Sequence, residues 1–169
     1  MLFKLPYLRS YSNICYQMTE MMDSTTEHYR KFHDVLGKEH VKYEIDSPFD
    51  FIQIASEGVG AGAIGNFIVY FSLSRELAAS LLNISSSTLY RWSKSNRILE
   101  RNYSIQLFEI TDLFLYGLEV FGNNENFFKW LNLPNTALGG MEPIELVELP
   151  GGVAKVRDVI GRIEHGVYS

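Results

Sequence analysis

The amino-acid sequence predicts an all-α fold, because three separate stretches repeat apolar residues at the three- and four-residue spacing of an α-helix. The first stretch, residues 75–94, has the pattern of two short helices joined by a tight turn. The second, residues 104–121, is apolar around most of a helix. The third lies near the C-terminus and has intervals of 3, 4, 3 and 4 positions: Val153, Val156, Ile160, Ile163 and Val167.

The first short helix of residues 75–94 ends at a sharp corner. Its apolar side consists of Leu77, Ala78, Leu81 and Leu82. Asn83 follows, and asparagine tolerates the left-handed backbone conformation that such a corner requires. Ser85 then offers a side-chain oxygen to the exposed amides of the next helix, so we expect it to be the N-cap.

The second short helix has an apolar side, at Leu89 and Trp92, and a polar outer face. This is the pattern of a DNA-binding helix-turn-helix, in which the second helix reads the DNA. A plain helical hairpin inside an all-α core has the same pattern and is the alternative. The predicted DNA contacts, which include the connector after the helix, are Ser85, Ser86, Ser87, Tyr90, Arg91, Lys94 and Arg97.

The charge distribution favours DNA binding. The chain has a net charge of −5, yet residues 74–101 contain five Lys or Arg and two Asp or Glu, a net charge of +3. Residues 1–73 carry a net −3 and residues 102–169 a net −5. So few cations predict weak, salt-sensitive DNA binding by a single copy, for which dimerisation is the usual remedy.

The composition argues against disulfides, metal sites and membrane spans. Cys15 is the sole cysteine, so no disulfide or Cys-based metal site forms within one chain, as suits a reducing cytoplasm. His28, His33 and His40 lack the i, i+4 spacing of a shared metal site, and we expect them to be solvated or locally hydrogen-bonded. No apolar run approaches the ~20 residues that cross a bilayer. We predict a cytoplasmic protein without a metal or cofactor.

A glycine-rich segment from Gly60 to Gly65 matches the fingerprint of dinucleotide-binding folds. That fingerprint needs a second strand with an acidic residue ~20 positions further on, and here this position falls inside the predicted helix-turn-helix. We therefore interpret residues 61–71 as an ordinary helix. No nucleophile, base and orienting group cluster at a readable spacing, so we predict no catalytic residue and no enzyme.

Residues 104–121 are predicted to form one long helix, with Ser104 as its cap and Gly122 at its end. A helix that is apolar around most of its circumference is buried or lies at an interface. We expect this helix to form a dimer contact through Leu107, Phe108 and Phe114. Further helices are predicted at residues 24–36, 125–131, 144–149 and 153–164.

The last third of the chain contains four characteristic blocks. They are Trp130-Leu131, the loop Pro134-Asn135-Thr136-Ala137-Leu138-Gly139-Gly140, Pro143-Ile144-Glu145-Leu146 and Arg162-Ile163-Glu164-His165-Gly166. Their order and lengths resemble the C-terminal toxin-binding domain of the Xre/MbcA/ParS antitoxins of type II toxin–antitoxin systems. Residues 57–92 resemble the helix-turn-helix domain that usually precedes it. The chain departs from the family at residues 58–62, where a proline and more polar residues are common.

The resemblance implies an all-α protein with a variable extension at residues 1–48, a helix-turn-helix domain at 49–103 and a toxin-binding domain at 104–169. It also implies a bacterial homodimer that binds the promoter of its own operon and neutralises a RES-domain toxin, which consumes NAD. In such antitoxins the C-terminal residues obstruct the NAD pocket of the toxin. The corresponding residues here are Arg162, Glu164, Gly166, Val167, Tyr168 and Ser169.

A blocking role suits the chemistry of the last residues. A pocket that binds pyrophosphate presents cations and amide donors, and a C-terminal carboxylate could bind to the same groups. The ring of Tyr168 could stack where the pocket stacks an aromatic base. Simple fraying of residues 166–169 is the alternative. At the level of the whole chain, the alternative is a plain repressor or partition protein with the same reading helix and no toxin partner.

Overall fold

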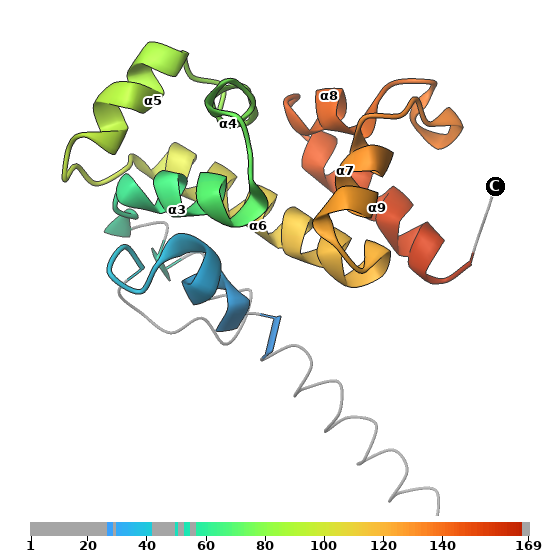
Figure 1. Ribbon diagram of the computed structural model, residues 1–169, viewed down its shortest axis with the longest axis horizontal. Helices are drawn as coiled ribbons and strands as arrows, with labels where there is room; N and C mark the ends of the chain where they lie inside the picture. Colours follow the sequence, from blue (N-terminus) through green and yellow to red (C-terminus); the bar gives the residue numbers. More distant parts are fainter. Residues whose placement is uncertain (1–26, 29, 42–49, 51–52, 55–56, 167–169) are drawn as a thin grey trace, which may run out of the picture.

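The computed structural model describes residues 27–28, 30–41, 50, 53–54 and 57–166, and this part of the chain is all-α, as predicted (Figure 1). Its elements are α3 (Gly62–Phe71), α4 (Arg75–Leu81), α5 (Ser86–Ser93), α6 (Arg101–Phe121), α7 (Asn124–Leu131), the 3-10 helix η1 (Thr136–Leu138), α8 (Pro143–Val147) and α9 (Gly152–Glu164). Residues 30–36 are also helical. Within the described ranges, the only bridge of extended type is an isolated one between Gly60 and Ile98.

Helix α6 is the axis of the molecule. In Figure 1 it runs between α3 and the N-terminal helical residues at one end and α7 and α9 at the other. The ring of Phe114, in the C-terminal half of α6, lies 5.2–5.6 Å from the ring centroids of Phe67 and Phe71 in α3 and of Phe127 and Phe128 in α7. Such aromatic pairs contribute about 0.5–1.5 kcal/mol each beyond the burial of their area. One side chain therefore joins elements from both halves of the chain.

The burial of α6 corrects the predicted dimer contact. The side chains of Leu107, Phe108 and Phe114 are 1%, 2% and 0% exposed within a single chain. Phe108 packs against Phe32, with ring centroids 6.1 Å apart. The prediction that these three residues contact a second copy is wrong, because they fill the core of their own chain. The apolar circumference of α6 does indicate burial, but the elements that cover it are α3, α7, α9 and the N-terminal region.

The predicted cap of this helix is also wrong. Helix α6 begins at Arg101, with Glu100 at the cap position, and Ser104 is buried inside it. The Ser104 hydroxyl accepts a hydrogen bond from the Val59 amide at 3.2 Å and donates one to the Leu99 carbonyl at 3.4 Å. It thus satisfies backbone groups of the loops beside α6 rather than the end of the helix. Helices α7, α8 and α9 each begin one residue earlier than predicted.

The glycine-rich segment packs against a side chain of its own protein. A Cβ atom at Gly62 would lie 2.3 Å from the imidazole of His40, and one at Gly60 would lie 2.8 Å from the same ring. Helix α3 follows, as predicted, from Gly62 to Phe71. Close packing against His40 therefore explains Gly60 and Gly62.

Gly117 offers a test of how tightly α6 and α7 fit. A Cβ atom there would lie 2.3 Å from the ring of Phe127, which is fully buried. We expect Gly117→Ala to lower the free energy of unfolding by about 1–3 kcal/mol through overpacking. Urea denaturation measures this loss.

Gly65→Ala is the matched control for Gly117→Ala. Gly65 lies within α3, and a Cβ there meets no atom within 4 Å. Alanine in a helix interior is favoured over glycine by about 0.5–1 kcal/mol where its Cβ meets no other atom, so this variant should be more stable than the wild type. Equal stability of the two variants would show that the contact between Gly117 and Phe127 is not tight in solution.

Candidate functional site

The corner between α4 and α5 has the backbone that the sequence predicts. Asn83 adopts a positive φ of 52°, in the left-handed region. The Ile84 amide reaches back to the carbonyl of Ala79 at 3.0 Å, and Ala79 is buried where the two helices meet. Asparagine is one of the few residues other than glycine that adopt this conformation readily. The prediction for Asn83 is confirmed.

Ser85 caps α5, also as predicted. Its hydroxyl oxygen accepts a hydrogen bond from the Thr88 amide at 3.1 Å. The same oxygen lies 2.9 Å from the hydroxyls of Ser87 and Thr88. These contacts give Ser85 a structural role at the start of α5, in addition to its predicted place among the DNA contacts.

The outer face of α5 is exposed and basic. Leu89 and Trp92 are buried, whereas Tyr90 is 55% exposed, and Ser86, Ser87, Arg91 and Lys94 are exposed with it. The Lys94 ammonium lies 5.8 Å from the centroid of the Tyr90 ring, and Arg91 donates a hydrogen bond to the hydroxyl of Thr88 at 3.3 Å. Within the described part of the chain, neither Arg91 nor Lys94 forms an ion pair with a carboxylate. Figure 1 places α5 at the outer edge of the molecule.

Arg97, unlike Arg91 and Lys94, pairs with a carboxylate among the described residues of its own chain. Its guanidinium lies 4.8 Å from the centroid of the Trp92 ring, and it pairs with the Glu100 carboxylate at 3.4 Å. A phosphate would have to compete with that carboxylate for Arg97.

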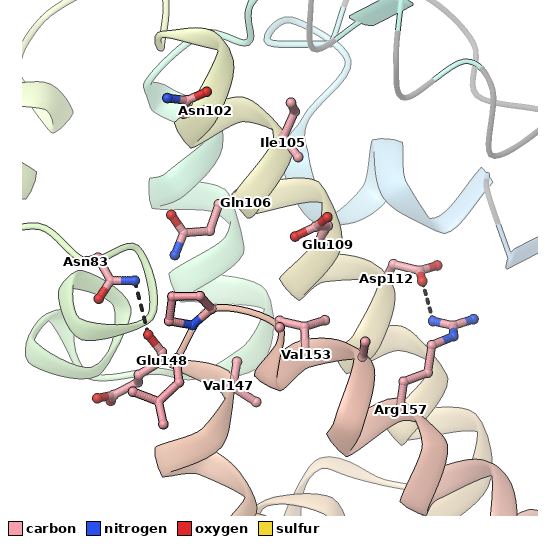
Figure 2. Close-up of a pocket in the computed structure, with 14 residues that line it drawn as sticks. Asn83, Asn102, Ile105, Gln106, Glu109, Asp112, Val147, Glu148, Val153 and Arg157 are labelled. Carbon is pink, nitrogen blue, oxygen red and sulfur yellow. Dashed lines mark hydrogen bonds and ion pairs between the residues drawn. The ribbon is translucent and has the colours of Figure 1, made fainter.

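The α4–α5 pair is attached to the C-terminal helices across a cleft of about 570 Å³ (Figure 2). The Asn83 side-chain amide donates a hydrogen bond to the Glu148 carbonyl at 3.2 Å, and the side-chain amide of Gln106 in α6 donates one to the Leu81 carbonyl at 2.8 Å. Each hydrogen bond therefore involves a residue at the corner between α4 and α5, Asn83 in the first and Leu81 in the second. The corner is therefore fixed relative to α6 and α8.

Helix α9 presents one buried face and ends in the open. Val156 and Ile160, from the predicted stripe, are fully buried, and Ile163 is half-buried. The exposed residues at this end include Arg162, Glu164 and Gly166, and Gly166 has a positive φ of 67°. Val167, Tyr168 and Ser169, the other predicted toxin contacts, lie outside the described residues.

A network of charged groups, which the sequence interpretation missed, connects the N-terminal region with α6 and α9. The two ring nitrogens of His28 lie 2.8 Å from the Asp112 carboxylate and 3.0 Å from the Glu119 carboxylate. Lys31 also pairs with Glu119, at 3.1 Å, and Arg157 of α9 pairs with Asp112. The expectation that His28 is solvated or locally hydrogen-bonded is therefore wrong, because its carboxylate partners lie far away in the sequence.

The partners of His28 determine its charge. Burial alone would lower the pKa of His28, but hydrogen bonds to Asp112 and Glu119 outweigh burial and raise the pKa from 6.5 to about 9. At neutral pH the ring is therefore protonated and donates both hydrogen bonds. On α6, polar residues recur at intervals of 3, 4 and 3 positions, a helical stripe that could have revealed the network: Glu109, Asp112, Tyr116 and Glu119.

Among the described residues, no group of three or more His, Cys, Asp or Glu side chains could hold a metal ion. The helices in these ranges also include none that is long and apolar enough to cross a membrane.

Residues 117–166 match the family model described as the antitoxin Xre/MbcA/ParS C-terminal toxin-binding domain. This part of the chain is therefore the toxin-binding domain of an Xre/MbcA/ParS-type antitoxin. The family that the C-terminal motifs predicted is thereby confirmed. A toxin-binding domain of an antitoxin agrees with the prediction that the chain is not an enzyme.

Curated relatives agree with this assignment. The antitoxin is 26% identical over 134 residues to the Prs ADP-ribosylating antitoxin of Sphingobium sp. (strain YBL2). The aligned region covers 73% of this chain and 83% of that protein. It is 38% identical over 54 residues to Antitoxin Xre of Yersinia enterocolitica, which covers 31% of this chain and 36% of that protein.

The fold has a solved counterpart. A chain in the crystal structure of the M. tuberculosis MbcT-MbcA toxin–antitoxin complex superposes with a TM-score of 0.51 and 21% identity, covering 64% of this antitoxin and 96% of that chain. This likeness supports the all-α architecture.

The raised pKa of His28 makes the stability of the antitoxin depend on pH. The folded protein binds the proton more tightly than the unfolded chain, so its stabilisation is fully present below pH 6.5 and is lost as pH rises through about 9. We expect the wild type to lose up to about 3 kcal/mol of unfolding free energy over this range, and His28→Ala to lack this loss. Urea denaturation from about pH 6 to about pH 10 measures both. Parallel pH profiles for the two proteins would contradict the assigned charge.

Proposed function

We propose that this antitoxin neutralises a cognate RES-domain toxin, which consumes NAD, by covering the toxin active site with its C-terminal segment. We further propose that it is a bacterial cytoplasmic protein that binds the promoter of its own operon through α5. The observation that carries the first part is the end of the matched domain, where α9 stops in the open and Gly166 turns the backbone away from the helix. The family match covers residues up to this point.

The exposed end of α9 suits insertion into a pocket. Val167, Tyr168 and Ser169 have uncharged side chains, and Tyr168 has an aromatic ring. A dinucleotide pocket accommodates flat rings, and residues that directly follow a rigid helix lose less conformational entropy on insertion than a free chain does. Arg162 and Glu164, exposed on the last turn of α9, are placed to contact the rim of such a pocket.

The promoter-binding part of the proposal is supported by the outer face of α5. This face carries Arg91 and Lys94, both exposed and without a carboxylate partner among the described residues. The α4–α5 corner has the geometry that the helix-turn-helix pattern predicted. With few cations, a single copy would bind DNA weakly, which supports a homodimer on the promoter. A repressor without a toxin partner would account for α5, but not for the match of residues 117–166.

Deletion of Gly166 to Ser169 tests the covering mechanism. Because Gly166 lies beyond the last turn of α9, the truncated antitoxin should unfold at the same temperature as the full chain and bind the promoter equally well. We expect the NAD consumption of the toxin, measured in the purified complex, to return to most of its free level. A truncated antitoxin that still inhibits the toxin fully would refute the covering mechanism.

Replacement of Arg91 and Lys94 by alanine tests the DNA-reading face. Loss of two phosphate contacts should weaken promoter binding about tenfold or more at moderate salt and lower the salt slope by about 2. Fluorescence anisotropy on the promoter measures both, and toxin inhibition should be unchanged. The double variant Lys38→Ala, Lys129→Ala removes the same charge from exposed positions elsewhere and should bind normally. Equal binding by both double variants would show that another surface reads the DNA.

A further inference from the structure

The direction in which the C-terminal segment leaves α9 decides where it can reach. Residues 167–169 reach at most about 10 Å from Gly166, so the last turn of the helix decides where these three residues can lie. That turn is exposed, and helix ends fray readily unless side chains hold them. In this antitoxin a side chain from α6 holds it.

Tyr116 of α6 forms a hydrogen bond with the last turn of α9. Its hydroxyl donates a hydrogen bond to the Glu164 carboxylate at 2.5 Å. Burial and the neighbouring carboxylate of Glu164 raise the pKa of Tyr116 to about 12, so the phenol keeps its proton and remains a donor.

Tyr116 is itself held in place. The guanidinium of Arg157 lies 4.8 Å from the centroid of the Tyr116 ring. Arg157 pairs in turn with Asp112, as Figure 2 shows, and Asp112 also accepts a hydrogen bond from His28. The Arg157 side chain is therefore held by the Tyr116 ring and by a carboxylate that is itself paired.

These contacts form one continuous series from the N-terminal region to the end of α9. Its members, in order, are Lys31, Glu119, His28, Asp112, Arg157, Tyr116 and Glu164. Lys31, His28, Asp112 and Tyr116 lie outside the residues 117–166 that the family model matches.

We propose that Tyr116 is a positioning residue for the toxin-binding segment, and that His28 extends this constraint to the N-terminal region of the antitoxin. The inference rests on the proposed covering function. The hydrogen bond of Tyr116 sets the exit direction of the segment and reduces the ordering cost of its insertion. His28 and Lys31 thereby act on toxin inhibition through their contacts with α6.

The test uses full-length antitoxin, at saturating excess, with the toxin encoded beside it, and measures residual NAD consumption. Tyr116→Phe removes one oxygen and keeps the ring under Arg157. Residual turnover should rise about tenfold, since a hydrogen bond to a charged group typically shifts an equilibrium by that factor. His28→Ala should raise it in the same direction by a smaller factor. Tyr70→Phe is the matched control, because Tyr70 is exposed on α3 and its hydroxyl forms no hydrogen bond with the residues that the structure describes, and it should inhibit like the wild type.

A second measurement separates positioning from general destabilisation. In the free full-length antitoxin, ¹⁵N relaxation of the Gly166 amide should show larger motion in Tyr116→Phe than in Tyr70→Phe, with equal promoter binding by both. If Tyr116→Phe inhibits fully and leaves Gly166 unchanged, while deletion of Gly166 to Ser169 abolishes inhibition, the positioning role is refuted and the covering function stands. If the deletion itself inhibits fully, the covering function fails and the inference fails with it.

Discussion

Both halves of this antitoxin depend on the packing of aromatic side chains around Phe114 in α6. Rings from α3 and from α7 meet on this fully buried side chain. Protein interiors are close-packed, so neither group of helices can shift without disturbing that contact. The hydrogen bond from Asn83 to the Glu148 carbonyl adds a second tie, between the α4–α5 corner and α8. The two candidate surfaces therefore belong to one framework, although they lie at its opposite ends.

The features that the sequence predicted correctly are those with local causes. Asn83 at the corner and Ser85 at the cap follow from the conformational preferences of single residues. The inward positions of Leu89 and Trp92 follow from helical spacing. The family assignment likewise relied on blocks of contiguous residues. In each case the deciding information lies within a few positions of the residue concerned.

The predictions that failed concern partners far apart in the chain. Apolar spacing shows that Phe108 is buried, but it does not show whether Phe32 or a second copy covers it. Ser104 carries every local sign of a cap, yet its hydroxyl serves the Val59 amide, 45 residues away. The partners of His28 are 84 and 91 residues away. Such pairings depend on topology, and one sequence alone does not specify them.

The part of the chain proposed to bind DNA and the part proposed to bind the toxin differ in net charge. DNA is a polyanion, and it favours the face of α5, where Arg91 and Lys94 have no carboxylate partner among the described residues. Residues 102–169, with a net charge of −5, would repel DNA. A pocket that binds the negatively charged pyrophosphate of NAD is itself positively charged, so it favours an acidic partner. The chain separates these net charges between residues 74–101, with +3, and residues 102–169, with −5. The hydrogen bond from Asn83 to the Glu148 carbonyl joins the two parts in one framework.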